Sequence, residues 1–300
     1  MKIAVQTAGI VNRFGVEEGF RMIREAGFEA VDANLDLWLT PKQIRGGELQ
    51  ESLFEKSDAE IVECCAPIID ALSRNGLTVT QAHAPFPTRV HAEEVNACVL
   101  RAVERTIALC GHLGCPRLVI HPGFLPFAER GSDEWNYNVR MYSALIPALR
   151  AHKVLCCLEN MFTHHETKLM CGPCATPAEA NAWIDALNEL AGERLFGFCR
   201  DVGHAHLVSQ DIRAFILQLV KNLVCFHIHD NNGVLDQHLF PYEGIMDWER
   251  FCDAVRESGF EGDLSFETYN GLNRYPAELA LPALRLAAAE ADYFRRRIQG

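Results

Sequence analysis

Hydrophobic residues along this chain form short continuous runs that alternate with longer stretches in which apolar positions recur every three or four residues. The short runs are rich in Val, Ile, Leu, Phe and Cys, as is typical of parallel strands buried on both faces. The longer stretches have the period of amphipathic helices. This alternation predicts repeated βαβ units and therefore a parallel sheet.

Eight such units can be counted, and each begins with one predicted strand. The strands are predicted at Lys2–Thr7, Ala30–Asn34, Thr78–His83, Arg117–His121, Val154–Glu159, Phe196–Asp201, Leu223–His229 and Leu264–Thr268. The clearest helices are predicted at Glu17–Ala26, Ala59–Arg74, Glu93–Leu113 and Trp248–Ser258, and Thr176 to Glu179 reads as a capping box that opens another. Eight units predict an α/β fold, a (β/α)8 TIM barrel, with residues 1–300 as a single domain.

The longer connections are predicted to be loops at Asp36–Asp58, Pro122–Asp133, Asn160–Ala175 and Asp230–Asp247. In a barrel, the loops that follow the strands build the mouth of the active site. Asp32, Asn34 and Asp36, at the end of the second strand, could touch a substrate, but the start of a solvated loop is the favoured interpretation.

Cys171 and Cys174 have the CxxC spacing of a redox or zinc pair. A thioredoxin-type pair opens a helix directly after a strand in a small βαβ domain. These two cysteines instead lie in a long predicted loop, so we interpret them as a turn with two free thiols.

Composition and charge narrow the class of protein. Hydrophobic residues make up 49% and charged residues 23%, which is typical of a soluble globular chain. The net charge of −12 argues against a nonspecific polyanion binder, and no run approaches the roughly 18 apolar residues of a membrane span. The first residues, MKIAVQTAGIVNRF, lack the apolar core of a signal peptide, so we expect a cytoplasmic protein whose twelve cysteines are reduced.

Metal-type side chains recur at the ends of the third to eighth predicted strands. They are His83, His121, Glu159, Asp201, His227 and Glu267, and successive members lie 26 to 42 residues apart. A barrel brings its strand ends into one ring, so these side chains are expected to converge on a divalent ion. Imidazole and carboxylate ligands together suit Mn²⁺, Zn²⁺, Co²⁺ or Mg²⁺ better than Ca²⁺.

Several short motifs at these positions give the chain a recognisable pattern: Gln81 to Pro85, Val119 to Gly123, Leu158 to Asn160, Asp201 to His204, His227 to Asn231 followed by Asp236 to His238, and Phe266 to Thr268. In their order and strand positions these motifs resemble the xylose isomerase-like barrel superfamily. That superfamily includes sugar isomerases, ketose 3-epimerases, inosose dehydratases and the AP endonucleases related to endonuclease IV. The resemblance runs over nearly the whole chain.

The resemblance implies up to three ion sites. In the epimerases one ion is held at positions matching Glu159, Asp201, His227 and Glu267. In the endonucleases a second ion uses positions matching His83, His121 and Glu159, and a third uses positions matching His204, Asp236 and His238. All nine residue types are present here, but single-metal sugar enzymes retain several of them, so the number of ions stays open.

His227 and His229 share one face of the seventh strand, so either could be the ligand. The pattern of the superfamily favours His227 and leaves His229 as a group that supports a ligand or touches substrate. His164 and His165 are interpreted as loop surface.

Three functions follow as hypotheses. The favoured one is a metal-dependent sugar isomerase or epimerase in which Glu159 and Glu267 move a proton through a metal-stabilised enediolate and His204 holds or shuttles one. A related dehydration would use the same chemistry. The second is a trinuclear phosphodiesterase at abasic DNA sites, which the acidic balance and the scarcity of basic loop residues disfavour. The third is a binding barrel without catalysis. A small carbohydrate is thus the expected partner, nucleic acid and membrane are not, and a homo-oligomer is left open.

Overall fold

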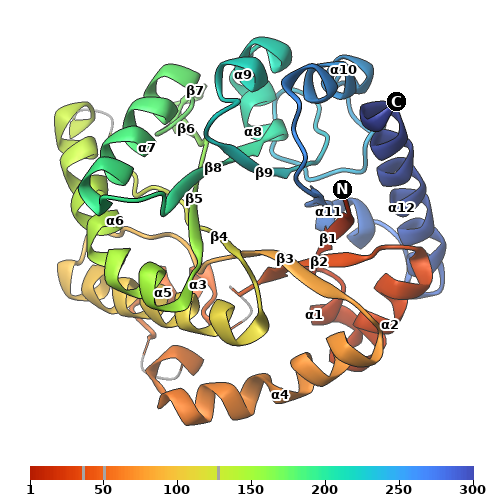
Figure 1. Cartoon of the computed structure of the whole chain (residues 1–300), viewed down its shortest axis with the longest axis horizontal. Helices are drawn as coiled ribbons and strands as arrows, with labels where there is room; N and C mark the ends of the chain where they lie inside the picture. Colours follow the sequence, from red (N-terminus) through yellow and green to blue (C-terminus); the bar gives the residue numbers. More distant parts are fainter. Residues whose placement is uncertain (36–37, 50–51, 127–128) are drawn as a thin grey trace.

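The computed structural model describes residues 1–35, 38–49, 52–126 and 129–300. Its central feature is a sheet of eight parallel strands in the order β10-β1-β2-β3-β4-β5-β8-β9 (Figure 1). The strands are β1 (Ile3–Gln6), β2 (Ala30–Asn34), β3 (Thr78–His83), β4 (Arg117–Val119), β5 (Leu155–Glu159), β8 (Phe196–Asp201), β9 (Leu223–His227) and β10 (Leu264–Phe266). A parallel bridge between Ile228 and Phe266 joins the last two strands and completes the ring. The predicted TIM barrel is confirmed.

Helices surround this ring and cover the outer faces of the strands (Figure 1). The longer ones are α2 (Val16–Ala26), α4 (Asp58–Arg74), α5 (Glu93–Leu113), α6 (Ser132–His152), α7 (Pro177–Ala191), α9 (Ile212–Gln218), α10 (Trp248–Ser258) and α12 (Ala277–Gln299). Short helices sit near the strand ends: α1 (Val11–Phe14), α3 (Pro41–Gly46), α8 (Val202–Leu207) and α11 (Tyr269–Asn273). None of the helices in the described ranges combines the length and the apolar character that a bilayer crossing needs.

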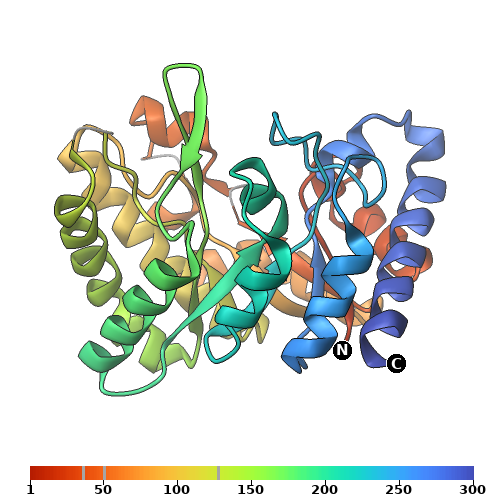
Figure 2. The ribbon, with the colours of Figure 1, turned by 90° about the horizontal axis from the view of Figure 1, so that it is seen from above.

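Two predictions about the connections need correction. The segment Asn160–Ala175 is not only loop, because β6 (Phe162–His165) and β7 (Lys168–Cys171) pair as an antiparallel hairpin. Figure 2 shows this hairpin projecting beyond the end of the barrel that lies opposite the two termini. The segment Asp36–Asp58 contains α3, which Thr40 opens with a capping box to Gln43.

Three strands end two residues before their predicted carboxyl ends, and β1 ends one residue early, at Gln6. The strand β4 ends at Val119, β9 at His227 and β10 at Phe266, although backbone bonds such as Ile120 N to Cys157 O (3.0 Å) continue the pairing briefly. Of the two hydrogen bonds in the capping box predicted at Thr176, one is present: the Thr176 hydroxyl accepts a hydrogen bond from Glu179 N (3.3 Å).

The barrel lumen is layered, and this layering positions the site. Side chains two residues apart on a strand share a face, so each metal-type residue has a lumen neighbour two positions earlier. For His121, Glu159, Asp201 and His227 these neighbours are Val119, Cys157, Cys199 and Cys225, which form one buried cluster. The polar ring therefore rests on a floor of small apolar side chains. All twelve cysteines, including those of the CxxC turn, are free thiols.

Candidate metal centre

Four side chains at the carboxyl ends of the strands form the centre of the site, and we call them the strand cluster: Glu159, Asp201, His227 and Glu267. Each offers a ligand atom within 4.8 Å of the others. Three are the last residues of β5, β8 and β9, and Glu267 directly follows β10. The hydrogen-bonded pairing of the strands places these residues at the same height in the barrel, since Asp201 and His227 are register partners.

His227 is the hub of this cluster. Its Nδ1 lies 3.2 Å from Glu159 Oε1 and 3.4 Å from Glu267 Oε2. All four residues are buried. Three carboxylates so close together and away from water need compensating positive charge, which either protonated imidazoles or a cation can supply.

His83 and His121 extend the strand cluster along β3 and β4 by way of Glu159. His121 Nε2 lies 3.0 Å from Glu159 Oε2 and 2.9 Å from His83 Nε2. These three residues form a second group whose ligand atoms are all within 4.8 Å. Glu159 thus belongs to both groups of ligand-type atoms.

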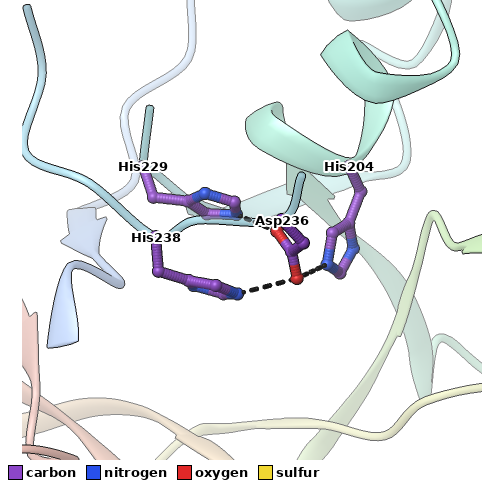
Figure 3. Close-up of side chains that lie close together, drawn as sticks. All are labelled: His204, His229, Asp236 and His238. Atoms are coloured by element: carbon purple, nitrogen blue, oxygen red, sulfur yellow. Dashed lines mark hydrogen bonds and ion pairs between the residues drawn. The ribbon is translucent and has the colours of Figure 1, made fainter. Parts of the chain in front are cut away.

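A third group lies beside these, and we call it the rim cluster: His204, His229, Asp236 and His238. His204 comes from the first turn of α8, and the other three come from the segment between β9 and α10. Figure 3 shows the imidazoles of His204 and His238 on either side of the Asp236 carboxylate. Asp236 Oδ2 lies 3.0 Å from His238 Nε2 and 3.6 Å from His204 Nε2, while Asp236 Oδ1 is buried without a hydrogen bond.

The outer nitrogens of the histidines test whether these groups suit an ion. Metal-binding histidines usually donate the other ring N–H to a carbonyl or carboxylate, which fixes tautomer and direction. The Nδ1 atoms of His83, His204 and His238 lie 2.8, 3.1 and 3.0 Å from the carbonyl oxygens of Ala84, Asn160 and Glu267. Their Nε2 atoms consequently face the clusters, where each can offer a lone pair to an ion once it carries no proton, so the donor set fits a divalent ion.

His227 has the opposite orientation, and a buried carboxylate holds it. Its Nε2 forms an ion pair with Asp32 Oδ2 at 3.2 Å without hydrogen-bond geometry, and that oxygen accepts hydrogen bonds from Gln81 Nε2 (2.7 Å) and Ser265 Oγ (3.1 Å). Asp32 is completely buried. The interpretation of Asp32 as the start of a solvated loop is therefore wrong, because the residue points into the lumen. Asn34 is half-buried within β2, and Asp36 lies outside the described residues.

His229 differs from the other histidines of the site. Its Nε2 lies 3.1 Å from both oxygens of Asp201, and its Nδ1 is buried without a hydrogen bond. The ring stacks on His238 with centroids 4.0 Å apart, and Gly203 makes room for it, since a Cβ there would lie 2.1 Å from His229 Cε1. His229 thus links the rim cluster to the strand cluster.

The buried ionisable groups of the site shift one another's pKa values. Burial favours the neutral carboxyl, yet His227 and His121 hold the pKa of Glu159 well below its usual range. Burial opposes protonation of His238, but Asp236 and Glu267 raise its pKa to about 9. His83 is the exception, because burial and His121 lower its pKa to about 4. With no cation bound, protons on these histidines would supply part of the positive charge that the carboxylates require.

A cavity of about 360 Å³ opens onto the clusters. Its floor includes Glu159, Glu267 and His204, and its walls are largely apolar, with Phe86, Phe124, Met161 and Phe162 among them. The structure thus brings all nine predicted metal-type residues to one end of the barrel. His164 and His165 are exposed on the hairpin, as expected, and lie outside these groups.

The comparisons with known proteins agree with this architecture. Residues 20–297 match the family model described as xylose isomerase-like TIM barrel. An uncharacterized protein, y4fM of Sinorhizobium fredii, is 23% identical over 296 residues, covering 94% of this chain and 86% of that protein.

Two solved structures share the fold. A D-tagatose 3-epimerase-like protein has a TM-score of 0.72 at 19% identity and covers 99% of this chain and 100% of its own. The 3-keto-D-glucoside 4-epimerase of E. coli has a TM-score of 0.70 at 18% identity and covers 99% of each chain. This chain belongs to the xylose isomerase-like TIM barrel family.

Proposed function

We propose that this chain is a divalent-metal-dependent sugar isomerase or epimerase that moves a proton at a carbon beside a carbonyl. The observation that carries the proposal is the convergence of Glu159 and Glu267 on His227 Nδ1, at the floor of a cavity with apolar walls. The strand cluster would hold the ion, Mn²⁺, Zn²⁺, Co²⁺ or Mg²⁺, and an ion there supplies a Lewis acid that polarises a carbonyl oxygen.

The two carboxylates are the proposed acid and base. One takes the proton from the carbon beside the carbonyl, and the electron pair of the broken C–H bond enters an enediolate. The other must carry the proton that it returns, either to the opposite face of the same carbon or to the neighbouring carbon. Burial and the apolar walls keep bulk water from protonating the intermediate.

His204 is proposed to handle a substrate hydroxyl. Its Nδ1 lies 3.1 Å from Asn160 O, which leaves Nε2 directed at Asp236 and the cavity that His204 lines. A nitrogen with this orientation can hold a hydroxyl or pass a proton to it. The epimerase names of the structural neighbours support a carbohydrate substrate.

An abasic-site phosphodiesterase is the second candidate, and the overlap of three ion-type groups is the observation that favours it. Two observations count against it. The net charge is −12, and two of the basic side chains near the mouth are engaged: Arg89 donates to Phe124 O, and Arg130 bonds Glu134 and Cys171 O, which leaves Arg45 as the arginine that lines the cavity. Phosphate contacts require available cations.

One experiment separates these functions. Protein loaded with Mn²⁺, Co²⁺, Mg²⁺ or Zn²⁺ is incubated in deuterated water with free ketoses, ketose phosphates and inososes, and products are followed by NMR. Deuterium at one carbon beside the carbonyl is expected, with the metal content per chain measured by elemental analysis. Conversion without deuterium would contradict the enediolate route. Efficient incision of an abasic duplex at low salt, with no sugar converted, would favour the phosphodiesterase.

A further inference from the structure

A second cavity, of about 420 Å³, adjoins the first and has walls of a different chemistry. His83, Phe86, Glu267 and Tyr269 line both cavities and separate them. Each cavity is by itself within the roughly 300–1,000 Å³ of ordinary ligand pockets. The proposed acid or base Glu267 is therefore reachable from two compartments, and the site has room for two sugar-sized units.

Carboxamides dominate the second cavity, which we call the amide cavity: Asn12, Asn34, Asn270 and Asn273 line it. They come from α1, β2 and α11, elements that follow or belong to the adjacent strands β10, β1 and β2. Gly9 lies between them at φ +73°, and a Cβ there would be 3.1 Å from Tyr269 Cβ, so the wall has no side chain that could fill the space.

Much of the hydrogen-bonding capacity of this wall is open to a ligand, because Asn12, Asn270 and Asn273 are exposed to solvent. The side chains of Asn12, Asn270 and Asn273 make no hydrogen bond to another described residue. A carboxamide both donates and accepts, as a sugar hydroxyl does, so a row of them matches a hydroxyl-rich ligand.

A phosphate does not fit the amide cavity well. Tight binding of a phosphate uses charge-assisted bonds from available cations. Arg13 is the cation among the residues that line this cavity, and its Nη2 donates to Tyr275 O (2.9 Å) while its guanidinium lies over Phe14. Arg13 keeps further N–H donors, but a single arginine beside four carboxamides favours an uncharged ligand unit over a phosphate.

We propose that the substrate has two units: a reacting keto sugar over the strand cluster, and a second, uncharged sugar unit in the amide cavity. This inference rests on the proposed function. It names the substrate class as a glycoside or disaccharide with a ketose unit, in preference to a free ketose or a ketose phosphate.

The test compares disaccharides that contain a free ketose unit with smaller sugars. Lactulose, maltulose and isomaltulose are set against fructose and fructose 6-phosphate, with kcat/KM taken from deuterium uptake. At least one disaccharide is expected to exceed fructose by about tenfold, the gain from about two additional neutral hydrogen bonds. A preference for fructose or its phosphate would overturn the proposal.

Variants locate the effect in the amide cavity. The double variant Asn12→Leu/Asn273→Leu should remove most of the advantage of the disaccharide and leave fructose turnover within about twofold. The matched control is Asn136→Leu, an exposed position on α6 that lines neither cavity. An equal loss for both sugars, or no loss for either, would contradict the assignment.

Binding measurements keep this test independent of catalysis. If no sugar takes up deuterium, the proposed function fails, and Kd values for the same five sugars are measured by calorimetry. Tighter binding of a disaccharide, weakened by the double variant, would still support the amide cavity. Absence of binding by every disaccharide would reject it.

Discussion

The strand cluster and the rim cluster contain similar residue types but are held in place by different means. Every member of the strand cluster ends a strand or follows one directly, so the hydrogen-bonded ladder sets its height and direction. In the rim cluster, Asp236 and His238 belong to a long connection without regular structure, and His238 has a positive φ of 46°.

What replaces the ladder in the rim cluster is a single buried carboxylate. Asp230 accepts hydrogen bonds from Asn231 N (2.8 Å), Met246 N (3.2 Å) and Trp248 Nε1 (2.8 Å), and its backbone pairs with Leu239. The strand cluster is therefore held in place by the backbone of the barrel, whereas the rim cluster depends on side-chain hydrogen bonds that a single substitution can remove.

The largest effect is expected from the strand cluster. Glu159→Gln and Glu267→Gln keep the size of each side chain and remove its charge and its basicity. Each variant should lose about 10²-fold or more in turnover, because loss of a general base alone costs that much. The fold should persist, as judged by circular dichroism.

The matched control is Glu94→Gln, which changes an exposed carboxylate on α5. Near-normal turnover by either variant, on any substrate that the protein converts, would show that the two-carboxylate mechanism is wrong.

The second effect tests the dependence of the rim cluster on Asp230. In Asp230→Ala, two buried donors and the part-buried Met246 N–H lose a charged acceptor, which should destabilise the fold by about 2–4 kcal/mol. Urea unfolding measures this loss, and Asp70→Ala, at an exposed position on α4, is the control.

The number of ions bound by Asp230→Ala tests the same dependence of the rim cluster on Asp230. Elemental analysis of Asp230→Ala should give fewer ions per chain than the unmodified protein, with the strand cluster still loaded. Equal stability and equal ion content would mean that the rim cluster does not depend on Asp230.

The difference between the two clusters also decides which residues could be placed from the sequence. The strand cluster follows from period and chain order, because a residue that ends a parallel strand in a barrel must join the ring. The place of Asp230 could not be predicted, since its partners lie up to eighteen residues away in a connection without a repeating pattern. The sequence of the β6–β7 hairpin, FTHHETKLMC, is largely polar and so predicts a loop in place of two strands.

The prediction that Asp32 begins a solvated loop is wrong for a different reason. A barrel strand is buried on both faces, so the alternation of polar and apolar residues does not tell which side chains face the lumen. Asp32 follows two apolar residues and precedes an apparent loop, which resembles a strand end. Its register partner Gln81 and the imidazole of His227 become visible only once the ring is closed.

A smaller effect is expected when the support of His227 is removed. Asp32→Asn leaves the volume unchanged but weakens the acceptor that orients His227 Nε2, so ion affinity at the strand cluster should fall by about 10- to 100-fold. Titration with Co²⁺, followed by visible absorption, measures this affinity without requiring turnover. Asp70→Asn is the control, and an unchanged cobalt affinity would exclude the supporting role.

The smallest effect concerns protons in the rim cluster. Burial opposes protonation of His238, but Asp236 and Glu267 raise its pKa to about 9, above the 6.5 of an unperturbed imidazole. A raised folded-state pKa gives stability that is fully present below about pH 6.5 and is lost as the pH rises through about 9. The ion-free protein should therefore show a falling Tm from pH 6.5 to 9.

A bound cation replaces that proton, so ion affinity should rise over the same range as the Tm of the ion-free protein falls. Thermal unfolding at pH 6.5, 7.5 and 8.5, with chelator and then with excess Mn²⁺, measures both trends. His238→Gln should flatten the slope seen with chelator, because it removes the titrating group. The same slope in this variant would place the titration elsewhere, with His204 and His227 as the next candidates, since burial opposes but neighbouring carboxylates raise the pKa of each.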